Sequence, residues 1–508
     1  MRTFELLLLL ADLMAFFAVS GPQRRGGLWM RHWPAIASVM VAVQWLVEGP
    51  RWQMLAAYAL TLLFLLVWLH RNFGSRGRRP EQQRRLPIVA AAANGLGALG
   101  LAFSVALPMM APVFSFPSPT GPYAIGTLTY HWIDADRPEV FVAEPRARRQ
   151  LMVQIWYPAQ ANSPGPPAAY MPDADAVTAA FARIHDKPAF VFGHFKFVTT
   201  HAKSSAPAAV DQPRYPVLLF LEGATGFRQM NTFQVEHLVS HGYIVVAIDQ
   251  PGAAAAVVFP DGHQAAGLTV AQFHATVSPS YMPGGTDPLH KSALLPNGRA
   301  LEDDSIIPYL AKDVVFALDR LDALNQADPN GILTGKLDLQ RVGTFGVSLG
   351  GIVVGEACRI DPRLKACLVM DAPMSAALVK AGLAQPGMWI TRDADSMRLE
   401  RQRAGGWPDA EIEAHQTSMR AVYEGLSGDG YFVRVPGMFH SNFTDIASWT
   451  PLSRVLGLAG PIDGHRAHRI VNAYSLAFFD RHLLGRPATL LNRTANQFPE
   501  ALLETRRP

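Results

Sequence analysis

Cysteine is nearly absent from this chain of 508 residues, which contains only Cys358 and Cys367. Two cysteines cannot build the multiple-disulfide framework of a small secreted domain, and their spacing matches no metal-ligand motif. We interpret them as two small buried side chains, with a single disulfide as the alternative for a domain outside the cytoplasm. The sequence therefore predicts neither a metal ion nor another cofactor.

Basic residues form no extended patch, although the net charge of the chain is +4. The arginines gather instead in two short segments between apolar runs. Such clusters usually set the orientation of membrane helices and do not bind DNA. We therefore exclude nucleic acid as a partner, and the sequence predicts no particular oligomeric state.

Apolar residues make up 49% of the chain, and the longest apolar runs lie before residue 115. A helix that crosses a bilayer needs about 20 apolar residues, and roughly 17 suffice. Four runs approach this length, of which the second is the shortest, so we predict an N-terminal bundle of about four transmembrane helices. The runs cover residues 4–20, 33–47, 52–70 and 87–114.

The loops between these runs predict their orientation. Arginines are concentrated in the first and third loops, whereas the N-terminus carries Arg2 and the second loop Arg51. The positive-inside rule places both arginine-rich loops in the cytoplasm. We therefore expect an integral protein of a bacterial inner membrane, whose chain after residue 114 lies on the extracytoplasmic side. The clustered arginines are Arg24, Arg25 and Arg31 in the first loop, and Arg71, Arg76, Arg78, Arg79, Arg84 and Arg85 in the third.

A competing interpretation makes the first run a cleaved signal peptide that ends near Ser20. Glu5 and Asp12 lie inside this run, and its leader is only weakly basic. Both features argue against a signal peptide, so we interpret the run as a membrane helix.

A segment rich in proline and glycine, residues 114–122, divides the chain into a transmembrane region, 1–114, and a second domain, 115–508. In the second domain short apolar strands alternate with helices, which predicts a mostly parallel sheet with helices on both faces. Residues 253–304 fit this pattern poorly, and we interpret them as a lid or substrate-loop insertion. We expect strands at 123–132, 151–157, 216–221, 243–249, 341–347, 365–370, 388–391 and 431–435, and helices at 234–240, 306–325, 348–360 and 467–484.

The most informative motif is Gly346-Val-Ser348-Leu-Gly350, which directly follows an apolar strand and precedes a helix. This strand–turn–helix context is typical of the nucleophile elbow of the α/β-hydrolase fold. The turn is so sharp that the serine backbone is strained, and the flanking glycines leave room for the crossing chains. The helix N-terminus also favours developing negative charge. The motif therefore predicts Ser348 as a nucleophile.

A serine hydroxyl needs a histidine to take its proton and a carboxylate to orient that histidine, in the chain order serine, acid, histidine. His440 follows the last predicted strand closely, in a loop at the edge of the sheet where the base is needed. The other histidines after Ser348 lie in or near predicted helices, and we expect them on the surface. They are His415, His465, His468 and His482.

The residues alone leave the acid open between two positions. Asp371 ends the strand predicted at 365–370, whereas Asp393 and Asp395 follow the next strand. Each of these carboxylates also fits a helix cap or a turn. An oxyanion hole needs two amide donors, which we assign to Leu349, after the nucleophile, and to Ala224, in the turn that Gly223 permits.

Several stretches of the second domain resemble the plasma-type (isoform II) platelet-activating factor acetylhydrolase family and its bacterial relatives. The resemblance implies an α/β-hydrolase that is metal-independent and removes short or oxidised acyl chains from phospholipids. It also implies the triad Ser348, Asp371 and His440, because this family takes its acid from the earlier strand. The stretches are 117–128, 149–158, 223–228, the elbow, 370–373, 437–445 and 460–464.

The sequence departs from the family pattern at two positions. Val347 and Glu222 stand where the family usually has histidine. A carboxylate at Glu222 would oppose a developing oxyanion unless it points away or pairs, for example with Arg228. The expected function is hydrolysis of a small-molecule or lipid ester at a membrane. The alternatives are a peptidase, a thioesterase or a polyester hydrolase on the same fold, and a non-catalytic membrane-bound binding protein.

Overall fold

The computed structural model describes residues 1–20, 28–73, 87–142, 144, 146–272, 306–492 and 497–507. The described residues form two compact units. The first unit contains residues 1–114 and 449–452, and the second contains residues 115–448 and 453–508. Most of the predicted insertion, residues 273–304, lies outside the described residues.

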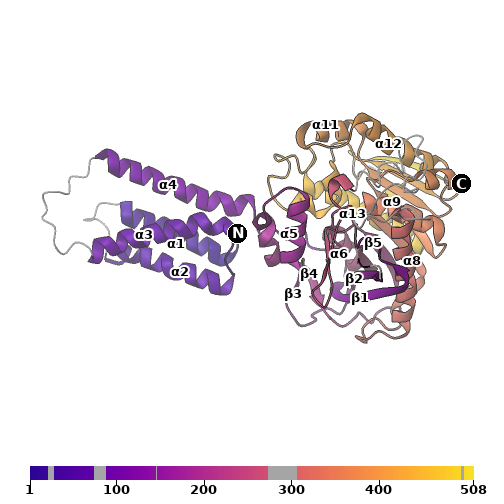
Figure 1. Cartoon of the computed structure of the whole chain (residues 1–508), viewed down its shortest axis with the longest axis horizontal. Helices are drawn as coiled ribbons and strands as arrows, with labels where there is room; N and C mark the ends of the chain where they lie inside the picture. The colour runs from indigo at the N-terminus through magenta and orange to yellow at the C-terminus, as the bar shows by residue number, and fades with distance from the viewer. Residues whose placement is uncertain are drawn as a thin grey trace. The chain divides into compact units, whose positions relative to one another are not determined.

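The first unit consists of helices that occupy the four predicted apolar runs (Figure 1). Within the described residues, three segments are long and apolar enough to cross a membrane, namely Thr3–Ser20, Trp52–Phe73 and Ala91–Met110. The remaining helix has only 15 residues, so a fourth crossing stays a prediction. The helices are α1 (Thr3–Ser20), α2 (Trp33–Val47), α3 (Leu55–Phe73) and α4 (Pro87–Met110).

The orientation of these helices also stays a prediction. Most of the arginines on which it depends lie outside the described residues, namely Arg24, Arg25, Arg76, Arg78, Arg79, Arg84 and Arg85.

Acidic residues inside the apolar helices find polar partners within the same unit. Arg51 donates to both carboxylate oxygens of Glu5, at 2.6 and 2.8 Å. The Thr61 hydroxyl donates to Asp12 at 2.7 Å. Both acidic side chains are buried. Buried charges require such partners, which explains how a helix as apolar as α1 accommodates two carboxyl groups.

The second unit is built on one sheet with the strand order β13-β12-β11-β10-β9-β5-β6-β2-β1-β4-β3. Strands β6 to β12 in this order are parallel neighbours, whereas β13 and β2 pair antiparallel at the two ends of that block. The central strands are therefore parallel, as the sequence predicts, within a sheet that is mixed as a whole. Its strands are β1 (Ala124–Pro138), β2 (Arg148–Ala159), β3 (Pro167–Ala169), β4 (Thr199–Ser204), β5 (Tyr215–Leu221), β6 (Ile244–Asp249), β9 (Leu337–Val347), β10 (Leu364–Met370), β11 (Gly387–Thr391), β12 (Gly430–Arg434) and β13 (Leu502–Arg506).

Helices cover both faces of the sheet (Figure 1). Phe345 in β9 packs against Phe479 of α13, with 6.1 Å between the ring centroids. Val369 in β10 lies one residue beyond the partner of Phe345, so it points to the opposite face, where it meets Gly351 of α9. The helices are α5 (Ala174–Ile184), α6 (Thr232–Ser240), α8 (Ile306–Gln326), α9 (Leu349–Ile360), α10 (Ala376–Ala381), α11 (Ala394–Ala404), α12 (Asp409–Glu424) and α13 (Gly464–Leu484).

The two cysteines are free and buried, as the sequence predicts. Cys358 belongs to α9, and Cys367 belongs to the neighbouring strand β10. Both form part of the core between helix and sheet.

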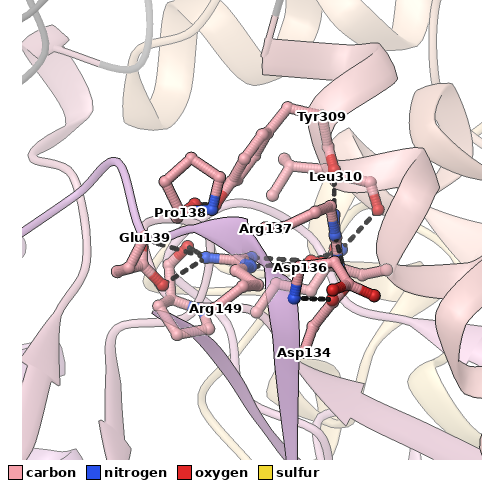
Figure 2. A network of polar contacts seen from close by, with 11 residues as sticks. Asp134, Asp136, Arg137, Pro138, Glu139, Arg149, Tyr309 and Leu310 are labelled. Carbon is pink, nitrogen blue, oxygen red and sulfur yellow. Dashed lines mark hydrogen bonds and ion pairs between the residues drawn. The ribbon is translucent and has the colours of Figure 1, made fainter. Parts of the chain in front are cut away.

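An ionic network around Arg149 joins β1, β2 and α8 (Figure 2). The Arg149 side chain is fully buried and lies 2.9 Å from Glu139 and 2.6 Å from Asp313. Arg137 pairs with the other oxygen of Asp313 at 2.6 Å. Burial raises the pKa of Asp313, but the two guanidinium groups outweigh it and hold that pKa below its ordinary value. The carboxylate is therefore charged.

The same network holds the chain that leaves β6. Arg149 donates to the carbonyl oxygen of Pro251 at 3.0 Å. Gln250 donates to Asp313 at 2.7 Å and to the carbonyl oxygen of Leu310 at 2.8 Å. The loop after β6 is thus fixed to α8 by buried hydrogen bonds. This loop in turn contacts the predicted oxyanion turn.

Candidate active site

Ser348 occupies a sharp turn between β9 and α9. Its backbone adopts φ 57° and ψ −124°, a conformation that non-glycine residues rarely take. A side chain at Gly346 would collide with the carbonyl oxygen of Gly350, and one at Gly350 would collide with that of Leu221. These close approaches explain why glycine flanks the serine on both sides. Ser348 itself is partly exposed.

Asp371 directly follows β10, the neighbour of β9, and its side chain is buried. One carboxylate oxygen lies 2.6 Å from Nδ1 of His440. The other accepts a hydrogen bond from the Thr391 hydroxyl at 3.0 Å. The backbone of Asp371 also has a positive φ, 45°, and its amide donates to Ile390 at 2.9 Å. The carboxylate is therefore held in one orientation, toward the histidine.

A buried arginine accompanies this carboxylate. Nε of Arg392 lies 2.9 Å from Asp371, and neither side chain is exposed. Burial raises the pKa of Asp371, but the charge of Arg392 and the hydrogen bond from His440 hold it well below its ordinary value. Asp371 is therefore ionised near pH 7.

His440 lies just beyond β12, and its side chain is 27% exposed. Its loop is closed by Asn442, whose side-chain oxygen accepts hydrogen bonds from the amides of Phe439 and Gly460, both at 2.8 Å. Because Nδ1 faces Asp371, Nε2 is the nitrogen left for a second partner. The histidine thus combines a buried, oriented side with an accessible one.

The turn after β5 lies against the serine. A side-chain carbon at Gly223 would lie 3.1 Å from Cβ of Ser348. The amide of Thr225 donates to Ala253 at 2.7 Å, and that of Gly226 donates to Gly223 at 3.0 Å. Among the described residues, the amide of Ala224 has no acceptor. Leu349, the other predicted donor, is the first residue of α9.

Glu222 is buried, and neither of its carboxyl oxygens has a hydrogen-bond partner within the described part of the chain. Arg228, the partner that the sequence suggested, pairs with Asp249 instead. Burial raises the pKa of Glu222 well above its ordinary value, and the nearby Asp249 raises it further. Burial thus favours the neutral form of Glu222, which places no negative charge beside the oxyanion turn.

The alternative acids lie elsewhere. Asp393 caps α11 by accepting a hydrogen bond from the amide of Ser396 at 2.8 Å. The side chain of Asp395 is 90% exposed and pairs with Arg398 at 2.9 Å. Only Asp371, among these three carboxylates, contacts His440 in the described structure.

The expectation that the other late histidines lie on the surface is wrong for two of them. His415 in α12 and His468 in α13 are buried. Burial lowers the pKa of each to about 4, so both rings are neutral near pH 7. The His468 ring stacks on Phe233 at 3.7 Å between centroids, which explains its place in an apolar interior.

Sequence reasoning missed three residues around the pair of Asp371 and His440. Arg392 pairs with Asp371 and with Glu400, and its guanidinium lies 4.5 Å from the ring of Trp407. Arg392 directly follows the apolar strand β11, and this position could have indicated that it lies at the same sheet edge as Asp371. Glu400 and Trp407 gave no such indication, because α11 and the segment after it show no pattern that links them to the site.

A cavity of about 660 Å³ lies between α6 and α13. It is lined by residues such as His237 and Arg469 and contains none of the predicted catalytic residues. The cavity is therefore separate from the constellation around Ser348.

Two comparisons with known proteins find similarity to the same group of enzymes. A family model described as platelet-activating factor acetylhydrolase, isoform II, matches residues 110–267. The platelet-activating factor acetylhydrolase of Canis lupus familiaris is 25% identical over 305 residues, which cover 58% of this chain and 62% of the relative. That of Cavia porcellus is 22% identical over 386 residues, covering 73% and 78%.

The chain is related to the isoform II platelet-activating factor acetylhydrolases. This finding confirms the resemblance seen in the sequence. The family match ends before Ser348, however, and the chain spans less than two thirds of the canine relative.

A solved structure gives independent support for the fold. The ferulic acid esterase from Streptomyces cinnamoneus superimposes with a TM-score of 0.56 and 26% sequence identity. The superposition covers 77% of this chain and 99% of the esterase. The described structure is thus similar in fold to this esterase. The relatives in dog and guinea pig are named as acetylhydrolases, and the solved structure is named as an esterase.

Proposed function

We propose that this chain is a serine carboxylic ester hydrolase that works through Ser348, Asp371 and His440. The observation that carries the proposal is the 2.6 Å contact between Asp371 and His440 at the edge of the sheet where the strained Ser348 turn lies. A buried carboxylate, a partly exposed histidine and a partly exposed serine are the parts that acyl transfer requires.

The proposed reaction is the transfer of the acyl group from the ester to Ser348 and then to water. Ser348 attacks the ester carbonyl while His440 takes the hydroxyl proton, and Asp371 stabilises the imidazolium that forms. The amides of Leu349 and Ala224 bind the oxyanion of the tetrahedral intermediate. His440 then gives the proton to the leaving alcohol, which produces an acyl-enzyme. Water attacks the acyl-enzyme by the same route and releases the carboxylic acid.

The proposed substrates are phospholipid esters with short or oxidised acyl chains. The names of the relatives in dog and guinea pig support this substrate class. The apolar helices would hold the enzyme in a membrane, which supplies such esters. We further propose that residues 115–508 form the catalytic domain on the extracytoplasmic side, with 253–304 as a lid or substrate loop.

A second candidate is an esterase for aromatic acyl groups. The ferulic acid esterase supports it, because its structure matches over 99% of its own length. The two candidates differ in the acyl group that is hydrolysed, so one assay separates them.

The test uses the full chain in detergent beside the Ser348→Ala variant. Substrates are p-nitrophenyl acetate, butyrate and octanoate, followed by platelet-activating factor and methyl ferulate. Ser348-dependent turnover that falls with chain length and includes platelet-activating factor supports the first candidate. Preference for methyl ferulate supports the second. A folded protein without Ser348-dependent turnover refutes both.

A further inference from the structure

The side chain of Arg392 is the centre of a buried cluster that touches both the proposed acid and the proposed base. It is fully buried and lies 2.9 Å from Asp371 on one side. On its other side it pairs with Glu400, whose side chain is 14% exposed. Both interactions of the guanidinium are therefore ion pairs in the protein interior.

The same cluster contacts His440 by two further routes. The Glu400 carboxylate accepts a hydrogen bond from the backbone amide of His440 at 3.3 Å. The ring of Trp407 lies under the guanidinium of Arg392, at 4.5 Å, and meets the His440 ring edge-on, at 5.0 Å and 90°. The histidine is therefore packed against the cluster as well as bonded to Asp371.

The charges of this cluster explain why it contains two carboxylates. Arg392 alone would cancel the charge of Asp371 and remove the anion that stabilises a protonated His440. Glu400 restores a net charge of −1 for the three groups. Among the described residues, His415 of α12 also faces these groups, and burial keeps it neutral near pH 7.

We propose that Arg392 and Glu400 act as a pair of positioning residues, in which Arg392 fixes the Asp371 carboxylate and Glu400 preserves the negative charge that His440 needs as a base. This inference rests on the proposed function of Ser348, Asp371 and His440. It assigns Arg392 and Glu400 to the catalytic machinery, although neither contacts the reacting atoms.

The proposal predicts how the acidic limb of the pH profile of kcat/KM, where activity is lost as the base becomes protonated, differs between variants. Glu400→Gln leaves a net charge of zero beside His440, so the limb moves to lower pH by about 0.5–1 unit. Arg392→Met leaves two carboxylates, so the limb moves to higher pH by about as much. The double variant again has a net charge of −1, and its limb returns to the wild-type position.

The position of the carboxylate gives a second readout. Without Arg392 the Asp371 side chain loses a fixed partner, so kcat falls about tenfold or more in Arg392→Met. In the double variant kcat stays low although its pH profile is restored. If the two residues had a purely structural role, kcat and the position of the acidic limb would not respond separately. Matched controls on α11 are Asp395→Asn and Arg398→Met, which remove exposed charges.

The experiment measures each profile in the full chain, both by ester turnover and by the rate at which a fluorophosphonate labels Ser348. Labelling reports the Ser348–His440 pair without requiring the right substrate. Limbs that do not move in Glu400→Gln, or that move in the same direction in both single variants, overturn the proposal. If Arg392→Met does not fold, the proposal is tested by Glu400→Gln alone, whose acidic limb should move to lower pH. Wild-type protein that neither turns over esters nor labels at Ser348 refutes the proposed function itself.

Discussion

The backbone amide of Ser348 donates a hydrogen bond to the carbonyl oxygen of Met370 at 3.0 Å. Met370 is the last residue of β10, and Asp371 follows it. The nucleophile turn is thereby tied to the strand that delivers the acid. Because strands β9 and β10 are parallel neighbours, both side chains leave the sheet at the same edge. The relative position of these two residues is therefore a property of the sheet.

The glycines of the elbow should be intolerant of any side chain. In Gly350→Ala the new Cβ would collide with the carbonyl oxygens of Leu221 and Glu222. We expect a loss of about 1–3 kcal/mol in the free energy of unfolding, because neither backbone can move without disturbing the sheet. Turnover should fall about 100-fold, since small displacements of a nucleophile are costly.

The matched control for this change is Gly193→Ala. Among the described residues, nothing beyond its own local backbone lies within 4 Å of a Cβ built at Gly193. This control should keep wild-type melting temperature and turnover. Equal behaviour of the two variants would show that the Ser348 turn is not as crowded as described.

The acid should be identified by Asp371→Asn. An asparagine keeps the shape of the side chain but cannot stabilise an imidazolium, and it favours the wrong histidine tautomer. We expect kcat to fall by about 10⁴ with little change in KM. Asp395→Asn is the control and should keep its activity, because the Asp395 side chain is 90% exposed. A larger loss in Asp395→Asn than in Asp371→Asn would reverse our assignment.

Periodicity and composition predicted most elements around the site, including β5, β9, β10, β11 and α13. These elements are mainly apolar strands and one amphipathic helix, whose local pattern matches their environment. The strand β13 was not predicted, because its Leu-Leu-Glu-Thr-Arg sequence is half exposed at a sheet edge and carries no buried-strand signal. Its pairing with β12 is a tertiary contact that no local pattern encodes.

The site was predictable only in part, because some of its residues are brought together by tertiary contacts that no local pattern encodes. The elbow has a local signature, and His440 follows from its position after a strand. The choice between Asp371 and the later carboxylates depends on which side chain turns toward the histidine, which the residues alone left open. The burial of His415 was also missed, because a charged helical stretch does not reveal which of its polar side chains faces the core.

The raised pKa of Glu222 predicts how stability depends on pH. Its pKa in the folded protein is well above the ordinary value of 4.5. Such a group contributes stability that is fully present below pH 4.5 and is lost as the pH rises toward the folded-state pKa. Glu222→Gln has no proton to lose, so the variant should gain melting temperature relative to wild type at pH 8 but not at pH 4. Thermal unfolding in detergent at both pH values measures this difference, and a gain confined to pH 4 would contradict it.

The network around Arg149 should be important for stability because it is buried and contains several charges. Arg149→Met removes the partner of Glu139 and one partner of Asp313, and it leaves their charge in a dry interior. We expect the free energy of unfolding to fall by about 3–5 kcal/mol. The matched control is Arg363→Met, whose side chain is 42% exposed and whose loss should cost about 1 kcal/mol or less.

The same variant should also affect catalysis, because the network holds the loop that supports the oxyanion turn. Arg149 donates to Pro251, and the carbonyl oxygen of Ala253 in that loop accepts the amide of Thr225, beside Ala224. Ester turnover at a temperature where Arg149→Met is folded should therefore be reduced, with the loss mainly in kcat, since the oxyanion donors act in the transition state. Arg363→Met should keep wild-type kcat. A destabilised Arg149→Met with unchanged kcat would mean that the turn at Ala224 keeps its geometry without support from α8.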